Sequence, residues 1–147
     1  AKFTNFKTDG SAGHDATFPD ADFFLMRVAE AYLNFAEADA RLHGDQTTDE
    51  GTAAINAIRK RAHASTREDK GYSLSDICDE WSREFYFEGR RRMDLIRFNR
   101  YGGNVNYNWQ WKGGTKEGRN FSKDLNIFAI PTNELTSNKN LTQNPGY

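Results

Sequence analysis

Residues 107–112 carry the side chains best suited to hold a ligand. Aromatic and polar residues alternate there, with Tyr107, Trp109 and Trp111 at every second position. In an extended segment these three rings would share one face. Aromatic rings stack on the apolar faces of sugars, and the intervening amides suit sugar hydroxyl groups, so the segment is a candidate carbohydrate platform. Alternatively, the same rings cover the helical core, because buried aromatic side chains contribute large packing energies.

A row of three glutamates follows helical i,i+4 spacing at Glu80, Glu84 and Glu88. Like charges at this spacing repel one another, so the helix needs cations from neighbouring elements. Arginines on this and the two preceding helical patterns can supply that charge. We therefore predict a half-buried ion-pair network that joins the helices, with these central members: Arg27, Arg59, Glu84, Glu88 and Arg92.

This network bears on catalysis as well. Nearby arginines lower the pKa of a carboxyl group, whereas the general acid of a glycosidase needs a raised pKa. No nucleophile motif and no glycine-rich phosphate-binding loop occurs in the sequence. The sequence therefore favours structural ion pairs over a catalytic carboxylate pair.

The residues that could bind a metal are scattered. His14, His43 and His63 do not have the spacing of a metal-ligand set. The aspartates among the first 22 residues lack the spacing of an EF-hand calcium loop. The single cysteine, Cys78, excludes an internal disulfide, and its place on a helical pattern predicts a small buried side chain. We expect neither a metal nor a cofactor.

Two amphipathic helices are predicted to form an antiparallel hairpin. In residues 23–42 apolar side chains recur at i, i+3 and i+4, and Gly44 follows as a stop signal. The second helix is predicted over residues 48–63, and Thr47 and Glu50 at its start have the spacing of a capping box. Alanines on both helices allow a close approach, and the pair is close to the ~34 residues of a tetratricopeptide unit.

A third helix is predicted from Ser73, a favourable N-cap residue, to about Arg97. Residues 101–123 are rich in Gly, Asn, Tyr and Trp, which indicates turns and loops. The expected organisation is one region with three parts, namely a loop over residues 1–22, helices over residues 23–98, and an irregular aromatic loop with a C-terminal tail over residues 99–147.

Composition limits the class of protein. The 147 residues amount to one domain, with a net charge of −1, 37% hydrophobic and 14% aromatic residues. A near-neutral chain lacks the basic surface that nucleic-acid binding needs. No stretch approaches the ~20 apolar residues that span a bilayer. Because aromatic residues are frequent at low overall hydrophobicity, we expect some of them to face another part of a longer protein.

Four segments, taken in order, resemble the C-terminal part of the SusD/RagB family. Each is short, but the four in this order make a specific signal over residues 23–147. They are residues 27–38 (RVAEAYLNFAEA), residues 54–62 (AINAIRKRA), residues 83–98 (REFYFEGRRRMDLIRF), and residues 128–147, which begin with FAIP and end with QNPGY.

The resemblance implies an all-α fold of tetratricopeptide-like hairpins with long irregular loops, as a fragment of a larger chain. It implies a glycan- or nutrient-binding lipoprotein of Bacteroidetes that performs no catalysis and delivers oligosaccharide to a SusC-like TonB-dependent transporter. The protein would lie on the cell surface at the outer membrane, through a lipid anchor on the N-terminal part of the parent protein. Cys78 does not match the lipidated cysteine.

The implied partners are an oligosaccharide or other nutrient, the transporter, and the N-terminal part of the same protein. The alternative function is a helical-repeat interaction module that binds the transporter or a peptide without contacting glycan itself. A sugar site at Tyr107, Trp109 and Trp111 would favour the first function. A peptide groove would instead depend on polar residues of the helix faces, such as Asn34 and Asn56.

Overall fold

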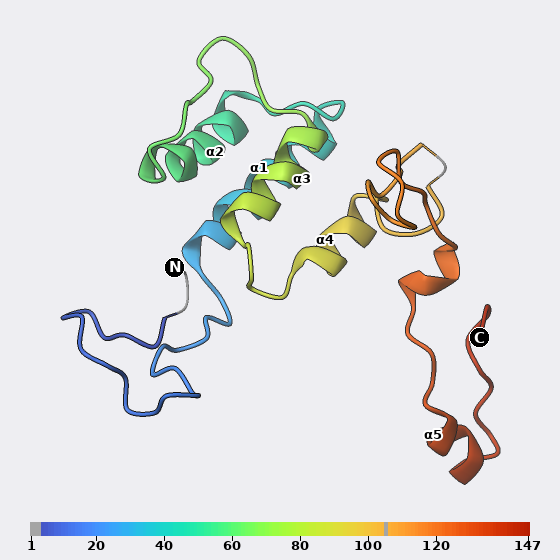
Figure 1. The fold of residues 1–147 in the computed structure, drawn as a ribbon. Helices are drawn as coiled ribbons and strands as arrows, with labels where there is room; N and C mark the ends of the chain where they lie inside the picture. The colour runs from blue at the N-terminus through green and yellow to red at the C-terminus, as the bar shows by residue number, and fades with distance from the viewer. Residues whose placement is uncertain (1–3, 105) are drawn as a thin grey trace. The chain divides into compact units, whose positions relative to one another are not determined.

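The fold is known from a computed structural model, which describes residues 4–104 and 106–147. Its helices are α1 (Val28–Leu42), α2 (Asp49–Arg61), α3 (Leu74–Glu84), α4 (Arg91–Arg97), the 3-10 turn η1 (Lys123–Asn126) and α5 (Thr132–Ser137) (Figure 1). Within the described residues, β pairing is limited to isolated bridges. The predicted all-α class is therefore confirmed. The chain divides into two compact units, residues 1–91 and 92–147.

Helix α1 packs against both α2 and α3 in the first unit (Figure 1). Its buried stripe consists of Ala29, Leu33, Ala36 and Ala40, which follow one another at helical spacing. Three of these four are alanines, so the helix axes can come close together. The helix begins at Val28 and not at residue 23, because Arg27 is extended, with φ −137° and ψ 150°.

The N-terminus of helix α2 is capped by a side chain of another helix, α1. The carboxylate of Asp39, on α1, accepts hydrogen bonds from the backbone N–H of Thr48 at 2.7 Å and from its hydroxyl at 3.0 Å. Thr48 is the N-cap residue and makes no side-chain cap of its own. The predicted capping box of Thr47 and Glu50 is therefore wrong. The Thr47 hydroxyl instead accepts a hydrogen bond from the N–H of Tyr72 at 2.8 Å.

The start of α3 is as predicted. Ser73 is the N-cap residue, and it forms a reciprocal capping box with Asp76. The helix buries Ile77, Cys78 and Trp81, each with no exposed surface. The prediction of a small buried side chain at Cys78 is thereby confirmed.

The predicted third helix is interrupted. Between the end of α3 and the start of α4, Phe87 (φ 62°) and Gly89 (φ 74°) adopt left-handed backbone conformations. A right-handed helix cannot continue through such residues. The single helix predicted over residues 73–97 is therefore wrong, and Glu88 and Arg92 do not face each other as i,i+4 neighbours of one helix.

The second unit has little regular structure. The backbones of Trp109 and Arg119 exchange two hydrogen bonds of 3.2 Å, so the chain between them forms a looped hairpin. Gly118 lies against the Trp109 carbonyl so closely that a Cβ would overlap it, which explains a glycine there. Near the C-terminus, the Gln143 side chain bonds both the N–H and the carbonyl of Ile130 at 2.9 Å and so holds the tail beside that segment.

No helix in the described part of the chain has the length and apolar character needed to cross a bilayer.

Candidate functional site

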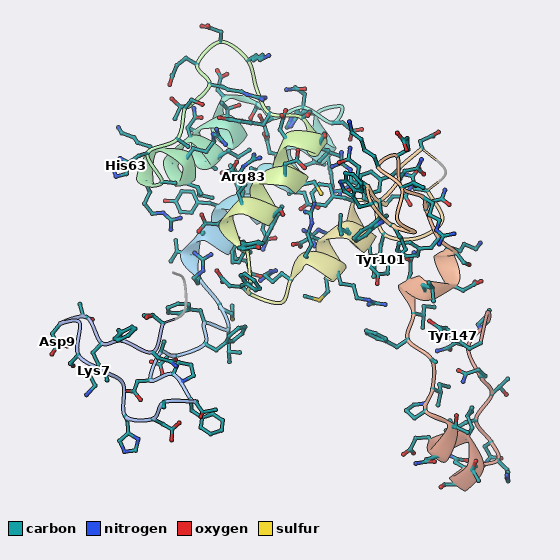
Figure 2. The ribbon with its side chains drawn as sticks, viewed as in Figure 1. Lys7, Asp9, His63, Arg83, Tyr101 and Tyr147 are labelled. Atoms are coloured by element: carbon teal, nitrogen blue, oxygen red, sulfur yellow. The ribbon has the colours of Figure 1, made fainter. Side chains whose placement is uncertain are left out.

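Trp109 lies at the centre of an aromatic cluster in the second unit. Its ring centroid is 5.8 Å from that of Tyr101, 5.6 Å from Phe121 and 6.4 Å from Tyr107. Its indole N–H donates a hydrogen bond to the Tyr101 carbonyl at 3.1 Å. Figure 2 labels Tyr101 within the loop that carries this cluster. Edge-to-face contacts of this kind stabilise packed aromatic rings, so the cluster is a small core for the loop.

Trp111 is placed differently from its two predicted partners. Tyr107 and Trp109 are half-buried, whereas 66% of Trp111 is exposed. Trp111 has a left-handed backbone (φ 64°) inside a turn, where its carbonyl accepts a hydrogen bond from the Gly114 N–H at 3.0 Å. The segment is therefore not extended through this residue, and the regular alternation on which a shared face depended does not hold.

The loop around Trp111 can offer stacking and hydrogen bonding together. The side chains of Asn108, Gln110 and Lys112 are exposed beside it. An exposed indole provides an apolar face for the C–H groups of a sugar ring, and amides and an ammonium group can pair with hydroxyls.

The first unit holds a cluster of buried ion pairs. Arg27 donates to Glu88 at 2.9 and 2.8 Å, to the Glu84 carboxylate at 2.7 Å and to the Glu84 carbonyl at 3.0 Å. The carboxylate side chains are only 7% (Glu84) and 3% (Glu88) exposed. Charge-assisted hydrogen bonds raise the pKa of Arg27, with Glu88 as the largest cause. These bonds tie the start of α1 to the end of α3.

The remaining two members of the predicted network, Arg59 and Arg92, lie in different units. Arg59 of α2 pairs with Glu80 at 2.6 Å, and Arg61 pairs with Glu84 at 2.5 Å. Arg92 instead donates to two backbone carbonyls of the second unit, those of Leu125 and Asn126, both at 3.0 Å. Arg92 thus holds the chain around η1. Its placement differs from the expectation because α3 ends at Glu84 and Arg92 lies in the separate helix α4.

Two stacked arginines were not predicted. The guanidinium of Arg27 lies 4.3 Å from the centroid of the Phe85 ring, and that of Arg90 lies 5.1 Å from it. Arg90 also lies 5.0 Å from the Trp81 ring and pairs with Glu30 of α1 at 2.6 Å. Such contacts favour charged groups at an apolar core. No local spacing signals them, since Arg90 reaches Glu30 only after the chain has turned.

Aspartates near the N-terminus accept hydrogen bonds from other residues of the same loop. Asp20 accepts a hydrogen bond from the His14 N–H at 2.8 Å. Hydrogen bonds from Ser11 lower the pKa of Asp9, and backbone hydrogen bonds from Thr17 and Phe18 lower that of Asp15. Across the described residues, no group of three or more His, Cys, Asp or Glu side chains is arranged to hold a metal ion.

Comparison with known proteins identifies the family of the chain. The SusD family model matches residues 1–147. The starch-binding protein SusD of Bacteroides thetaiotaomicron is 44% identical over 146 residues, which are 99% of this chain and 25% of that protein. The chain therefore spans about a quarter of the length of the curated relative it matches.

Solved structures agree with this result. A SusD superfamily protein from Parabacteroides distasonis superposes with a TM-score of 0.65 at 23% identity, over 85% of this chain and 27% of that one. A laminarin-binding SusD-like protein superposes with a TM-score of 0.64 at 26% identity, over 97% of this chain and 26% of that one. With a family match over the whole chain and a helical fold shared with these proteins, the chain belongs to the SusD family.

Proposed function

We propose that this chain is part of a cell-surface protein that captures oligosaccharides without changing them chemically. Its relative in Bacteroides thetaiotaomicron is a starch-binding protein, and a structural neighbour binds laminarin, so the ligands of both proteins are glucose polysaccharides. Glu84 and Glu88 pair with two arginines, Arg27 at the start of α1 and Arg61 on α2, and because these ion pairs join helices they support a scaffold role for the cluster.

The observation that carries the proposal within this chain is Trp111. Its indole is exposed, lies on a turn with a left-handed backbone, and is flanked by polar side chains at Gln110 and Lys112. Trp109 is joined to that turn because its carbonyl accepts a hydrogen bond from the Lys112 N–H at 3.1 Å, and its ring contacts Tyr107 within the aromatic cluster. In this proposal Trp111 stacks on a sugar ring, and its neighbours donate to or accept from the hydroxyls.

The whole protein's partners belong to the same proposal. The oligosaccharide is passed to a SusC-like TonB-dependent transporter, and a lipid anchor on the N-terminal part of the parent protein holds it at the outer membrane. The N-terminal part also completes the fold around this chain. The large exposed apolar side chains on α1 support this last point, because folded proteins rarely leave so many neighbouring apolar groups in contact with water.

A second function has a specific observation in its favour. The exposed apolar side chains of α1 suit a helical-repeat module that binds another protein and never contacts glycan. The two functions differ in what removal of the Trp111 side chain does, because an interaction face on α1 does not include residue 111.

The experiment is a glycan-panel gel retardation assay on the full-length polypeptide that contains this chain. Starch and laminarin are the first two polysaccharides, and Trp111→Ala is the test variant. We expect the affinity that the retardation measures to fall at least about fivefold in the test variant, by analogy with the about 1–3 kcal/mol that stacking of one base on an aromatic side chain contributes. Trp111→Phe should retain part of the retardation.

The matched control is Lys116→Ala, an exposed residue of the same hairpin. It should leave retardation unchanged. Full retardation in Trp111→Ala would remove this loop from the glycan site and assign the loop to structure alone. Release of reducing sugar from any polysaccharide of the panel would contradict capture without chemistry.

A further inference from the structure

The looped hairpin around Trp111 carries a positive charge. Residues 107–119 contain the exposed cations Lys112, Lys116 and Arg119 and a single carboxylate, Glu117, so the segment has a net charge of +2. Clustered charges of one sign on a surface raise the local concentration of ligands of the opposite sign. The charge of this loop therefore bears on which ligands it receives.

The arginines of the first unit are neutralised within that unit, whereas the cations of the hairpin are not. Arg59 of α2 pairs with the buried carboxylate of Glu80 at 2.6 Å, and other arginines of α2 and of the segment that follows it pair in the same way. Within the described residues, the side chains of Lys112 and Arg119 have no such carboxylate partner. Their charge is available to a ligand.

Arg119 reaches the turn that exposes Trp111. Its backbone exchanges two hydrogen bonds of 3.2 Å with that of Trp109, which places it on the opposite arm of the hairpin. Its guanidinium lies against Gly113, where an added Cβ would come within 2.5 Å of Nε and 2.7 Å of Cζ. Gly113 thus leaves the space beside the turn that the guanidinium occupies.

Lys112 belongs to the same turn. Its backbone N–H donates a hydrogen bond to the Trp109 carbonyl at 3.1 Å, and its ammonium nitrogen lies 4.7 Å from the centroid of the Phe121 ring. This cation–π contact holds the ammonium beside the aromatic cluster while the side chain stays exposed. An exposed indole, an ammonium group and a guanidinium are therefore gathered at one turn.

A ligand that uses all three groups has an apolar face and a negative charge. A guanidinium can donate two parallel hydrogen bonds to a carboxylate or a sulfate, and an ammonium group attracts either anion as a point charge. A neutral sugar offers only hydroxyls to the two cations. A sugar ring that bears a carboxylate or a sulfate supplies both the stacking face and the anion.

We propose that the site at Trp111 selects glycans that carry an anionic group, with the sugar ring on the indole and the anion paired with Arg119 and Lys112. This inference deepens the proposed function and rests on its stacking at Trp111. Starch and laminarin, which the two similar proteins bind, are uncharged. The charge at this turn therefore predicts that the chain binds an acidic glycan more tightly than a neutral one.

Affinity electrophoresis of the full-length polypeptide tests this selectivity with matched pairs of polysaccharides. Dextran sulfate is compared with dextran, and polygalacturonate with its carboxyl-reduced form. We expect the acidic member of at least one pair to bind about tenfold more tightly at about 0.05 M salt, and this ratio to fall to about twofold at about 0.5 M, because salt screens exposed charges. The pair that shows the larger ratio distinguishes sulfate from carboxylate.

Variants of the two cations locate the selectivity. Arg119→Gln and Lys112→Gln should each lower the acidic-to-neutral affinity ratio about threefold, since each removes one exposed charge contact. Arg119→Lys should lower it less, because it keeps the charge and loses only the planar fork. The matched control is Lys139→Ala, an exposed cation of the same unit outside the hairpin, which should leave the ratio unchanged. The ratio of the parent protein and its salt dependence require no variant, so they test the inference even if a variant folds poorly.

Two results would overturn the inference. One is equal affinity of the parent protein for the acidic and neutral members of both pairs, and the proposed function then stands if Trp111→Ala still weakens binding of both members. The other is an acidic preference that survives in the double variant Lys112→Gln/Arg119→Gln, because the anion would then be recognised elsewhere. Retardation that Trp111→Ala leaves undiminished contradicts the proposed function itself.

Discussion

Arg27 and Glu88 lie 61 residues apart in the sequence and meet in a two-pronged ion pair, with Nε to Oε2 at 2.9 Å and Nη2 to Oε1 at 2.8 Å. The planar guanidinium matches the carboxylate in this geometry, which a lysine could not reproduce. Because Arg27 also stacks on Phe85, the pair closes one end of the first unit over its core.

Glu88→Gln should lower the free energy of unfolding by about 3 kcal/mol, because it leaves the charge of Arg27 without this partner in a site where Glu88 is 3% exposed. Arg83→Gln is the control. Arg83 is 57% exposed beside Glu80, so its loss should cost less than about 1 kcal/mol. Urea unfolding of the full-length protein measures both, and equal losses would show that burial does not set the value of these pairs.

Gly51→Ala should destabilise the protein, although glycine to alanine inside a helix ordinarily stabilises by about 1 kcal/mol. A Cβ at residue 51 would overlap the Asp39 carboxylate, which then could not cap α2. Lys60→Ala, an exposed change on the same helix, should have little effect. The thermal midpoint is the measurement, and a midpoint raised by Gly51→Ala would mean that α1 and α2 can separate without cost.

Asp76 should contribute a pH-dependent part of the stability. Hydrogen bonds from Arg67, and then from Ser73, hold its pKa well below the usual range. The stabilisation is therefore complete above the unfolded-state pKa of about 3.9 and is lost as the pH falls toward the native pKa. Asp76→Asn should be less stable than the parent at pH 7, and the gap should shrink progressively below about pH 4.

Unfolding midpoints between pH 7 and pH 2 measure this gap. Arg67→Gln should show the same trend, because it removes the main cause of the shift from the other side. A gap of constant size over this range would mean that the Asp76 charge does not contribute.

Trp109 and Trp111 should differ sharply in their effect on stability. Trp109→Ala removes the centre of the aromatic cluster and should cost about 3 kcal/mol, whereas Trp111→Ala should stay within about 0.5 kcal/mol because the side chain is 66% exposed. Limited proteolysis within residues 106–120 reports the local effect. Similar protease resistance in both variants would contradict a structural role for Trp109.

The local part of the fold could be predicted from the sequence. The stripe of Leu33 and Ala36 on α1, the helix start at the N-cap residue Ser73 and the burial of Cys78 all depend on side chains a few residues apart. Their periodicity is set by the helix itself, so it is visible without coordinates. The order of short motifs along residues 23–147 likewise suffices to indicate the family.

Tertiary structure decided what depends on distant contacts. Phe87 adopts a left-handed backbone that its residue type does not favour, and this breaks the helix between α3 and α4. The cap on Thr48 comes from Asp39 across a turn, and Arg92 reaches carbonyls 33 and 34 residues away. The turn that exposes Trp111 while Trp109 packs inward belongs here too. Spacing along a chain identifies neighbours within an element, but only packing between elements selects which of two similar side chains is left in water.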